Sequence, residues 1–390
     1  MNKEDFKGDT SPVDEGSDGN PPALEEVKRY NRIKILVSLV SIVVGVGFIL
    51  AILFTGFSGV LERWISGLTM QPYLAFLLFM IILGAFEMFL NLPLSFYGGY
   101  VVEHRFGLSS QSFRRWCWEE MKGMLVSVAL LTPLLLVFYS LLRRFPVFWW
   151  IPVGFLYFLF SVLLVKLGPV LIFPLFYRFT PIEDESLKVR LKRLSEGVGL
   201  NVSGIFTFNL SKNTKKANAA FAGLGRTRRI LLADTLLEHF SAEEIEAVTS
   251  HELGHYRHGH LWKGILIGLV LSFGGLFTAN GLYRLAMGRF GGVRGDELAA
   301  LPLLGLFLMG LGLVSAPLQN LISRRFERQA DGFAVDKMRG AGHFISSLEK
   351  LGRMNKADSE PHPLVEFFFY SHPPLKKRIE RIRSIAEVGE

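Results

Sequence analysis

The sequence SAEEIEAVTSHELGHYRHGH, residues 241–260, carries the pattern around which the rest of the chain is arranged. Ser241 is followed three residues later by Glu244, which is the capping-box signature of a helix start. Helix-compatible residues continue to about Tyr256. The pattern therefore predicts a helix that carries the motif His-Glu-Leu-Gly-His.

The two histidines of this motif are spaced to hold a metal ion. His251 and His255 are four residues apart, so a helix places both imidazoles on one face. Such a pair can bind zinc, with Glu252 projecting beside it. Zinc lowers the pKa of water and polarises a carbonyl, and Glu252 can take the proton and pass it to a leaving amine. We expect one Zn²⁺ per chain and a zinc metalloendopeptidase.

A third zinc ligand is expected downstream, in the sequence RRFERQAD at 324–331. Glu327 can complete a two-histidine, one-glutamate site that leaves one coordination position open. Asp331, four residues later, can accept a hydrogen bond from the second nitrogen of a ligand histidine. Two apolar segments separate the two motifs, so both emerge on the same side of a membrane.

The flanking sequence indicates a multi-pass membrane protein. Half of the 390 residues are hydrophobic and 20% are charged, and about 20 apolar residues span a bilayer. Six stretches qualify, near 33–55, 73–92, 123–142, 147–167, 264–285 and 300–319. The lipid bilayer is therefore an expected partner. The net charge of +8 is explained by cytoplasmic loops rather than by nucleic acid, which we do not expect as a partner.

Basic residues before the first span predict a cytoplasmic N-terminus. Because successive spans cross the membrane in opposite directions, the C-terminus and the active site are then expected on the cytoplasmic side. In a bacterium the protein would lie in the inner membrane. Glu87 and Lys166 interrupt the spans. They either pair in a polar chamber, or Lys166 reaches the interface while Glu87 lies in a local polar pocket.

The expected fold is mainly α, with a zincin-type α+β domain on the cytoplasmic face. Ile205–Phe208 and Arg229–Leu232 are predicted strands, and a third strand is expected within 218–225. The predicted units are a disordered polar tail (1–30), four membrane helices with a cytoplasmic loop at 93–122 (31–167), the zinc-protease domain (168–263), two further membrane helices (264–320) and the rest of the protease domain (321–390).

The remaining candidate residues have less specific patterns. His258 and His260 follow the motif, and we expect structural or metal-supporting roles for both. His104, His239, His343 and His362 are expected at the polar surface. The single cysteine, Cys117, excludes a disulfide and any multi-cysteine metal site, and is expected to be an inert thiol or a palmitoylation site near the membrane boundary.

Several blocks in a fixed order resemble the CAAX prenyl protease 1 family of membrane zinc metallopeptidases, over about residues 73–385. They are LPLSFY at 92–97, VEHRFG at 102–107, PLF at 174–176, Asn218-Ala219, the motif at 251–255, Glu327 with Asp331, and SHPP at 371–374 with Arg378. The resemblance implies a ring of helices around an intramembrane chamber. The eukaryotic members have seven spans, whereas six are expected here.

The resemblance also implies residue roles that spacing does not reveal. Asn218 and Ala219 match the strand that holds the substrate backbone, which would bind an extended peptide by strand addition. His372 and Arg378 match residues that lie over the metal and bind the reacting carbonyl. The implied substrate is a peptide or protein that is membrane-associated or prenylated.

Three functions compete at this stage. The first is a CAAX-type processing protease, and the second is a membrane quality-control metalloprotease of the bacterial heat-shock type. The third is a catalytically silent scaffold or transporter, against which the intact Glu252 argues. The sequence does not distinguish the substrates of the first two.

Overall fold

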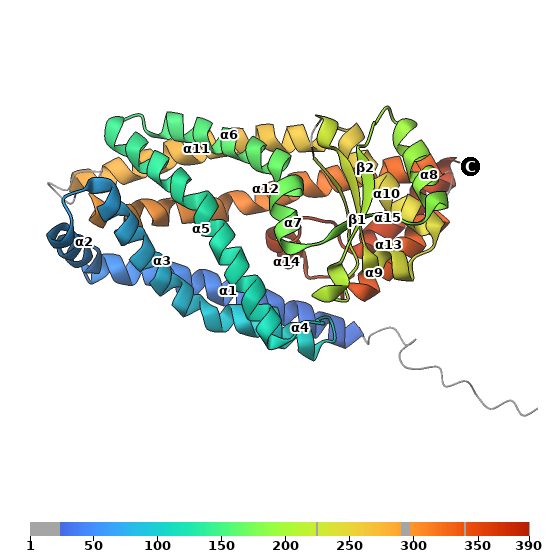
Figure 1. The fold of residues 1–390 in the computed structure, drawn as a ribbon, viewed down its shortest axis with the longest axis horizontal. Helices are drawn as coiled ribbons and strands as arrows, with labels where there is room; N and C mark the ends of the chain where they lie inside the picture. Colours follow the sequence, from blue (N-terminus) through green and yellow to red (C-terminus); the bar gives the residue numbers. More distant parts are fainter. Residues whose placement is uncertain (1–23, 224, 290–296, 339–340, 390) are drawn as a thin grey trace, which may run out of the picture.

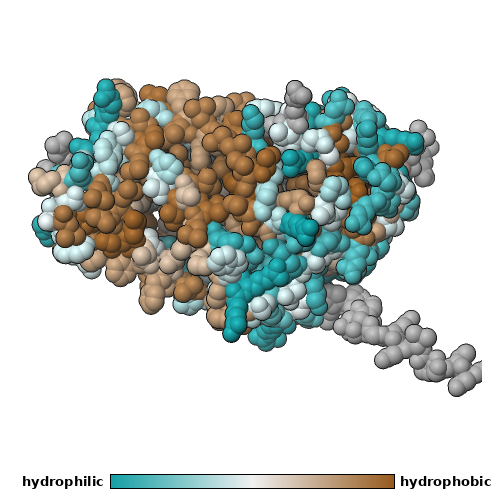
Figure 2. Space-filling view, viewed as in Figure 1, coloured by the Kyte–Doolittle hydropathy of each residue, from teal (hydrophilic) through white to brown (hydrophobic). Residues whose placement is uncertain are grey.

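The computed structural model describes residues 24–223, 225–289, 297–338 and 341–389. Figure 1 shows an elongated molecule with long helices at one end and a small sheet with shorter helices at the other. In Figure 2, hydrophobic side chains cover most of the long-helix end, and hydrophilic side chains gather around the sheet. This division is typical of a protein that is partly embedded in a bilayer.

Six helices among the described residues are long and apolar enough to cross a membrane, as predicted. They are α1 (Leu24–Phe54), α3 (Pro72–Phe96) continued by the π-helix η1 (Tyr97–Val101) and α4 (Val102–Arg105), α5 (Phe113–Arg144), α6 (Trp150–Leu167) continued by η2 (Gly168–Ile172) and α7 (Phe173–Phe176), α11 (His260–Arg289), and η5 (Leu298–Ala300) leading into α12 (Leu301–Met338). Each observed helix is longer than its apolar stretch, because backbone hydrogen bonding continues into polar turns outside the hydrocarbon.

The structure differs from the sequence prediction in two boundaries and one additional helix. Residues 24–30, assigned to the disordered tail, belong to α1, where buried Tyr30 packs against Val102 and Phe106. Residues 1–23 lie outside the described residues. The cytoplasmic loop predicted at 93–122 is helical except for residues 106–112. A short amphipathic helix, α2 (Phe57–Leu68), was not predicted.

The sheet has four strands, one more than predicted. The order is β1 (Phe179–Pro181), β2 (Gly204–Phe208), β4 (Arg229–Ala233) and β3 (Ala219–Ala222). β2 and β4 are parallel, whereas β1 and β3 are antiparallel to their neighbours and form the edges. β1 escaped prediction because three residues give no readable alternation.

Shorter helices complete the sheet end of the molecule. They are α8 (Glu185–Glu196), α9 (Asp234–His239), α10 (Ala242–Arg257), α13 (Gly342–Met354), α14 (Pro363–Phe369) and α15 (Leu375–Gly389). One apolar core joins the sheet to α8, α9 and the start of α10. A second core joins α10 to α12, α13 and α15. Helix α10 is thereby fixed on two sides, and it carries the predicted metal motif.

An apolar cavity of about 560 Å³ lies among α1, α3, α5, α6, α11 and α12. Glu87 is among its lining residues and accepts a hydrogen bond of 2.8 Å from Asn91, one turn away. Lys166 is exposed, and among the described residues no ion pair joins it to Glu87. Of the two alternatives for these charges, the structure does not support pairing, and Glu87 has a local polar partner in Asn91.

Candidate metal centre

Helix α10 begins at the predicted capping box. The Ser241 hydroxyl accepts a hydrogen bond from the Glu244 N–H at 3.3 Å, and the Ser241 N–H donates to the Glu244 carboxylate at 2.9 Å. Glu244 is buried and also accepts hydrogen bonds from Ser346 and Lys350 on α13. Burial acts to raise the pKa of Glu244, but these hydrogen bonds outweigh it and lower the pKa. The carboxylate therefore fixes the start of α10 to a neighbouring helix.

Helices α10 and α12 approach each other unusually closely at the glycine of the motif. A Cβ on Gly254 would lie 3.0 Å from the Ala330 Cα and 3.1 Å from its carbonyl oxygen. These contacts involve backbone atoms, which a rotamer change cannot relieve. Gly254 therefore permits the close crossing that brings Glu327 of α12 beside the histidines of α10.

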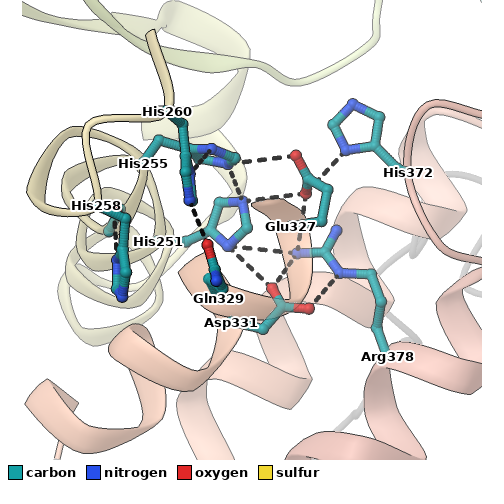
Figure 3. Close-up of polar contacts among 10 residues, drawn as sticks. His251, His255, His258, His260, Glu327, Gln329, Asp331, His372 and Arg378 are labelled. Atoms are coloured by element: carbon teal, nitrogen blue, oxygen red, sulfur yellow. Dashed lines mark hydrogen bonds and ion pairs between the residues drawn. The ribbon is translucent and has the colours of Figure 1, made fainter. Parts of the chain in front are cut away.

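Three predicted ligands converge at this crossing, as Figure 3 shows. The Nε2 atoms of His251 and His255 are 3.2 Å apart, and they lie 3.4 Å and 3.2 Å from the two Glu327 carboxylate oxygens. Zinc bonds of about 2.0–2.2 Å in a tetrahedron place ligand atoms about 3.4 Å apart. The three residues thus meet the spacing of a zinc site and form a group that could hold a metal ion.

The charge balance of the group also suits a cation. The side chain of Glu327 is 4% exposed, and its Oε2 atom is buried without a well-formed hydrogen bond. Burial acts to lower the pKa of His251, but hydrogen bonds to Asp331 and Glu327 outweigh it and raise the pKa to about 9. A metal ion with these ligands would replace the proton that His251 otherwise retains.

Asp331 contacts His251 on the side of the ring that faces away from Glu327. The His251 Nδ1 atom lies 2.9 Å from the Asp331 carboxylate, which leaves Nε2 directed at the other ligands. Arg378 on α15 forms two hydrogen bonds to Asp331, of 2.6 Å and 3.0 Å. Burial acts to lower the pKa of Arg378, but Asp331 outweighs it and raises the pKa. Arg378 therefore stays charged while it orients Asp331.

His372 and Arg378 reach the same group from the C-terminal segment (Figure 3). The His372 Nδ1 atom lies 2.9 Å from the Glu327 Oε2 atom, and an Arg378 guanidinium nitrogen lies 4.0 Å from that oxygen. The His372 side chain is 62% exposed, so it borders the open side of the group. Glu252 follows His251 on α10 and is half-buried, and its charge helps to raise the pKa of Arg378.

The predicted substrate-binding residues lie at an edge of the sheet. Ala219 begins β3, which is the last strand in the sheet order, and exposed Asn218 precedes it. The Asn218 carbonyl accepts a hydrogen bond of 3.0 Å from the Ala233 N–H. Phe221 of β3 packs against Tyr256 of α10, with ring centroids 5.4 Å apart. The edge strand is thereby anchored to the helix that carries the histidines.

The structure identifies one site residue that the sequence did not suggest, Gln329. The Gln329 Oε1 atom lies 2.8 Å from His260 Nε2, and His260 Nδ1 lies 3.0 Å from His255 Nδ1. An amide oxygen accepts, so His260 carries its proton on Nε2 and accepts from the His255 Nδ1–H. His255 then keeps the lone pair on Nε2 free for a metal. The only sequence signal was the position of Gln329 two residues after Glu327.

The remaining histidines do not belong to the group of predicted metal ligands. His258 contacts the Gly254 carbonyl at 3.0 Å, so its role is structural. His104 was expected at the polar surface but is half-buried, where it contacts the Tyr100 and Gln111 carbonyls at 2.8 Å and 2.7 Å. His239, His343 and His362 are exposed, as is Cys117.

Comparisons with known proteins find similar chains. Residues 181–386 match peptidase family M48, and residues 19–178 match the CAAX prenyl protease N-terminal family with five membrane helices. A Bacillus subtilis protein named as an uncharacterized metalloprotease, YhfN, is 28% identical over 94% of this chain and 87% of its own length. CAAX prenyl protease 1 of Saccharomyces cerevisiae is 31% identical over 80% of this chain and 72% of its own length.

A solved structure is also similar. The crystal structure of Ste24p from S. mikatae superposes with a TM-score of 0.80 and 26% sequence identity. The match covers 92% of this chain and 88% of that one, so it includes both the long-helix end and the sheet end.

Proposed function

This chain belongs to peptidase family M48 as a CAAX prenyl protease 1-like membrane metalloprotease, and we propose that it cleaves peptide bonds with one zinc ion held by His251, His255 and Glu327. The observation that supports this most is the set of ligand-atom separations of 3.2–3.4 Å. Carboxylate and imidazole ligands in this number suit a catalytic zinc site with one open position.

The chemistry divides between the metal and the surrounding side chains. When bound, zinc supplies a Lewis acid that polarises the scissile carbonyl and acidifies the attacking water. Glu252 accepts the proton of that water and delivers it to the leaving amine. His372 and Arg378 donate to the carbonyl oxygen as negative charge develops on it. Asp331 holds His251 in the tautomer that binds metal through Nε2.

Replacing Glu252 tests the assignment of the general base. Glu252→Gln should retain about one zinc per chain and lose at least about 100-fold of the peptidase activity, because general-base catalysis contributes about 10²–10⁴-fold. Zinc content is measured by elemental analysis and cleavage with a quenched fluorescent peptide. Undiminished cleavage by this variant would overturn the mechanism. A wild-type protein that binds zinc but cleaves nothing would favour the silent scaffold or transporter.

For substrate binding we propose strand addition at β3. Strand β3 forms an edge of the sheet, and Asn218 is exposed at its start. An extended peptide would pair with β3, with the Asn218 side chain contacting its backbone. We further propose that residues 168–263 and 321–390 act as one cytoplasmic protease unit, with both chain termini cytoplasmic.

The proposal also extends to the class of substrate that the enzyme cleaves. The yeast relative is named a CAAX prenyl protease, and the apolar cavity of about 560 Å³ has a size and lining that suit a lipid chain. We therefore propose a membrane-associated peptide, with prenylated peptides preferred. A farnesylated peptide should show a lower KM than its unprenylated twin. Equal kcat/KM for the two, with cleavage of unfolded membrane proteins, would instead favour a quality-control protease.

A further inference from the structure

A cavity with a different lining from the apolar one lies where α5, α7 and the sheet meet. Its volume is about 510 Å³. We call it the basic pocket, because five of its eleven lining residues are cationic: Arg115, Lys122, Arg178, Lys212 and Arg229. The metal ligands are not among the lining residues, and the proposed mechanism assigns no role to the pocket, although the PLF block at 174–176 forms part of its wall.

The lysines of the basic pocket share one carboxylate. Glu119 lies 2.8 Å from Lys122 and 3.4 Å from Lys212. Lys122 also donates to the Leu175 carbonyl at 3.3 Å, and Lys212 donates to the Phe176 carbonyl. These contacts fix the two ammonium groups in partly buried positions. One acid therefore balances half of the charge on this pair and none of the charge on the arginines.

The positive charges of the three arginines of the pocket are not balanced by ion pairs. Within the described part of the chain, no ion pair reaches Arg115, Arg178 or Arg229. The Arg229 guanidinium lies over the Phe206 ring, and its Nε atom is buried without a hydrogen-bond partner. Burial lowers the pKa of Lys212. The nearby cations Lys122 and Arg115 lower it as well, whereas Glu119 acts to raise it. The pocket therefore has a positive potential that the protein itself does not neutralise.

The position of the basic pocket indicates which anion would occupy it. Large apolar side chains are exposed on the two helices that line the pocket. Trp118 and Met121 on α5 are 53% and 42% exposed, and Leu175 on α7, itself a lining residue, is 54% exposed. Such side chains lie against lipid, whereas the arginines belong at the polar boundary. In Figures 1 and 2, α7 lies near the border where the hydrophobic surface gives way to the hydrophilic one. Headgroup phosphates lie at this depth of a bilayer.

We propose that the basic pocket binds the headgroup of an anionic phospholipid, with the acyl chains lying against the exposed apolar side chains of α5 and α7. Guanidinium groups bind phosphate oxygens in a bidentate manner, and basic pockets between membrane helices bind anionic headgroups. The Arg229 guanidinium, which lines the pocket, would add a third arginine to the phosphate site. A bound lipid would join the membrane helices to β1 at the edge of the sheet.

The test is native mass spectrometry of the full-length, zinc-loaded protein in neutral detergent. Phosphatidylglycerol and phosphatidylcholine with identical acyl chains are titrated separately. We expect tighter binding of phosphatidylglycerol, and about a fivefold loss of its affinity for each of Arg115→Gln and Arg178→Gln. Arg114→Gln is the matched control, because Arg114 is an exposed neighbour on α5 that does not line the pocket.

Each remaining outcome overturns the proposal. Equal affinities for the two lipids, or equal losses in Arg114→Gln and Arg115→Gln, would show general surface attraction. Displacement of phosphatidylglycerol by inorganic phosphate at equal concentration would indicate a site for free phosphate. A last outcome would assign the pocket to the substrate. In it, Arg115→Gln leaves lipid binding unchanged but raises the KM for a peptide with a free C-terminal carboxylate, and does not raise the KM for the amide of that peptide.

Discussion

At the scale of single residues, we expect His260 to control zinc affinity without touching the metal. His260→Ala removes the acceptor 3.0 Å from His255 Nδ1, so the ring of His255 loses its fixed tautomer and orientation. Loss of such a supporting contact typically costs about 10–100-fold in metal affinity. Competition with a chromophoric zinc chelator measures this loss. Gln329→Leu should act in the same direction through His260.

His258→Ala provides the matched control for this prediction. His258 stacks on His260 with ring centroids 5.4 Å apart, but it contacts the Gly254 carbonyl rather than a ligand. Its replacement should leave zinc affinity within about twofold of wild type, because no ligand loses a partner. Equal zinc affinities for the His258 and His260 variants would contradict the relay from Gln329 to His255.

At the scale of secondary-structure elements, the crossing of α10 and α12 should depend on Gly254. Gly254→Ala places a methyl group 3.0 Å from backbone atoms of Ala330, so the helices must separate. Such overpacking typically costs about 1–3 kcal/mol, and the separation should also weaken zinc binding. Gly332→Ala on α12 meets no atom within 4 Å and should be neutral or stabilising, because alanine favours helix. Thermal unfolding in detergent, with and without zinc, compares the two variants.

The elements also show how far sequence reasoning reaches. The capping box, the i,i+4 spacing and the long apolar runs are local signals, and they predicted α10, its histidines and six spans. The extension of α1 to Leu24 and the helical turns within 93–122 depend on contacts such as Tyr30 with Glu103, 73 residues apart. The relay from Gln329 to His260 spans 69 residues and leaves no periodic trace in either segment. The roles of His372 and Arg378 came from resemblance, because a loop histidine before two prolines carries no pattern.

At the scale of the whole molecule, α12 links the membrane to the metal centre. It runs without interruption from Leu301 beside the apolar cavity to Glu327 and Asp331 at the site. A second connection joins α1 to the sheet end, where Glu103 bonds Lys34 and Lys216, each at 2.9 Å. The sheet end is therefore joined to the helical end at two places.

If one metal ion joins α10 to α12, an anomalous difference map at the zinc absorption edge will show where it binds. We expect one peak per chain, about 2.0–2.2 Å from His251 Nε2, His255 Nε2 and a Glu327 carboxylate oxygen. A peak at other residues, or zinc bound by the histidines with Glu327 turned away, would contradict it.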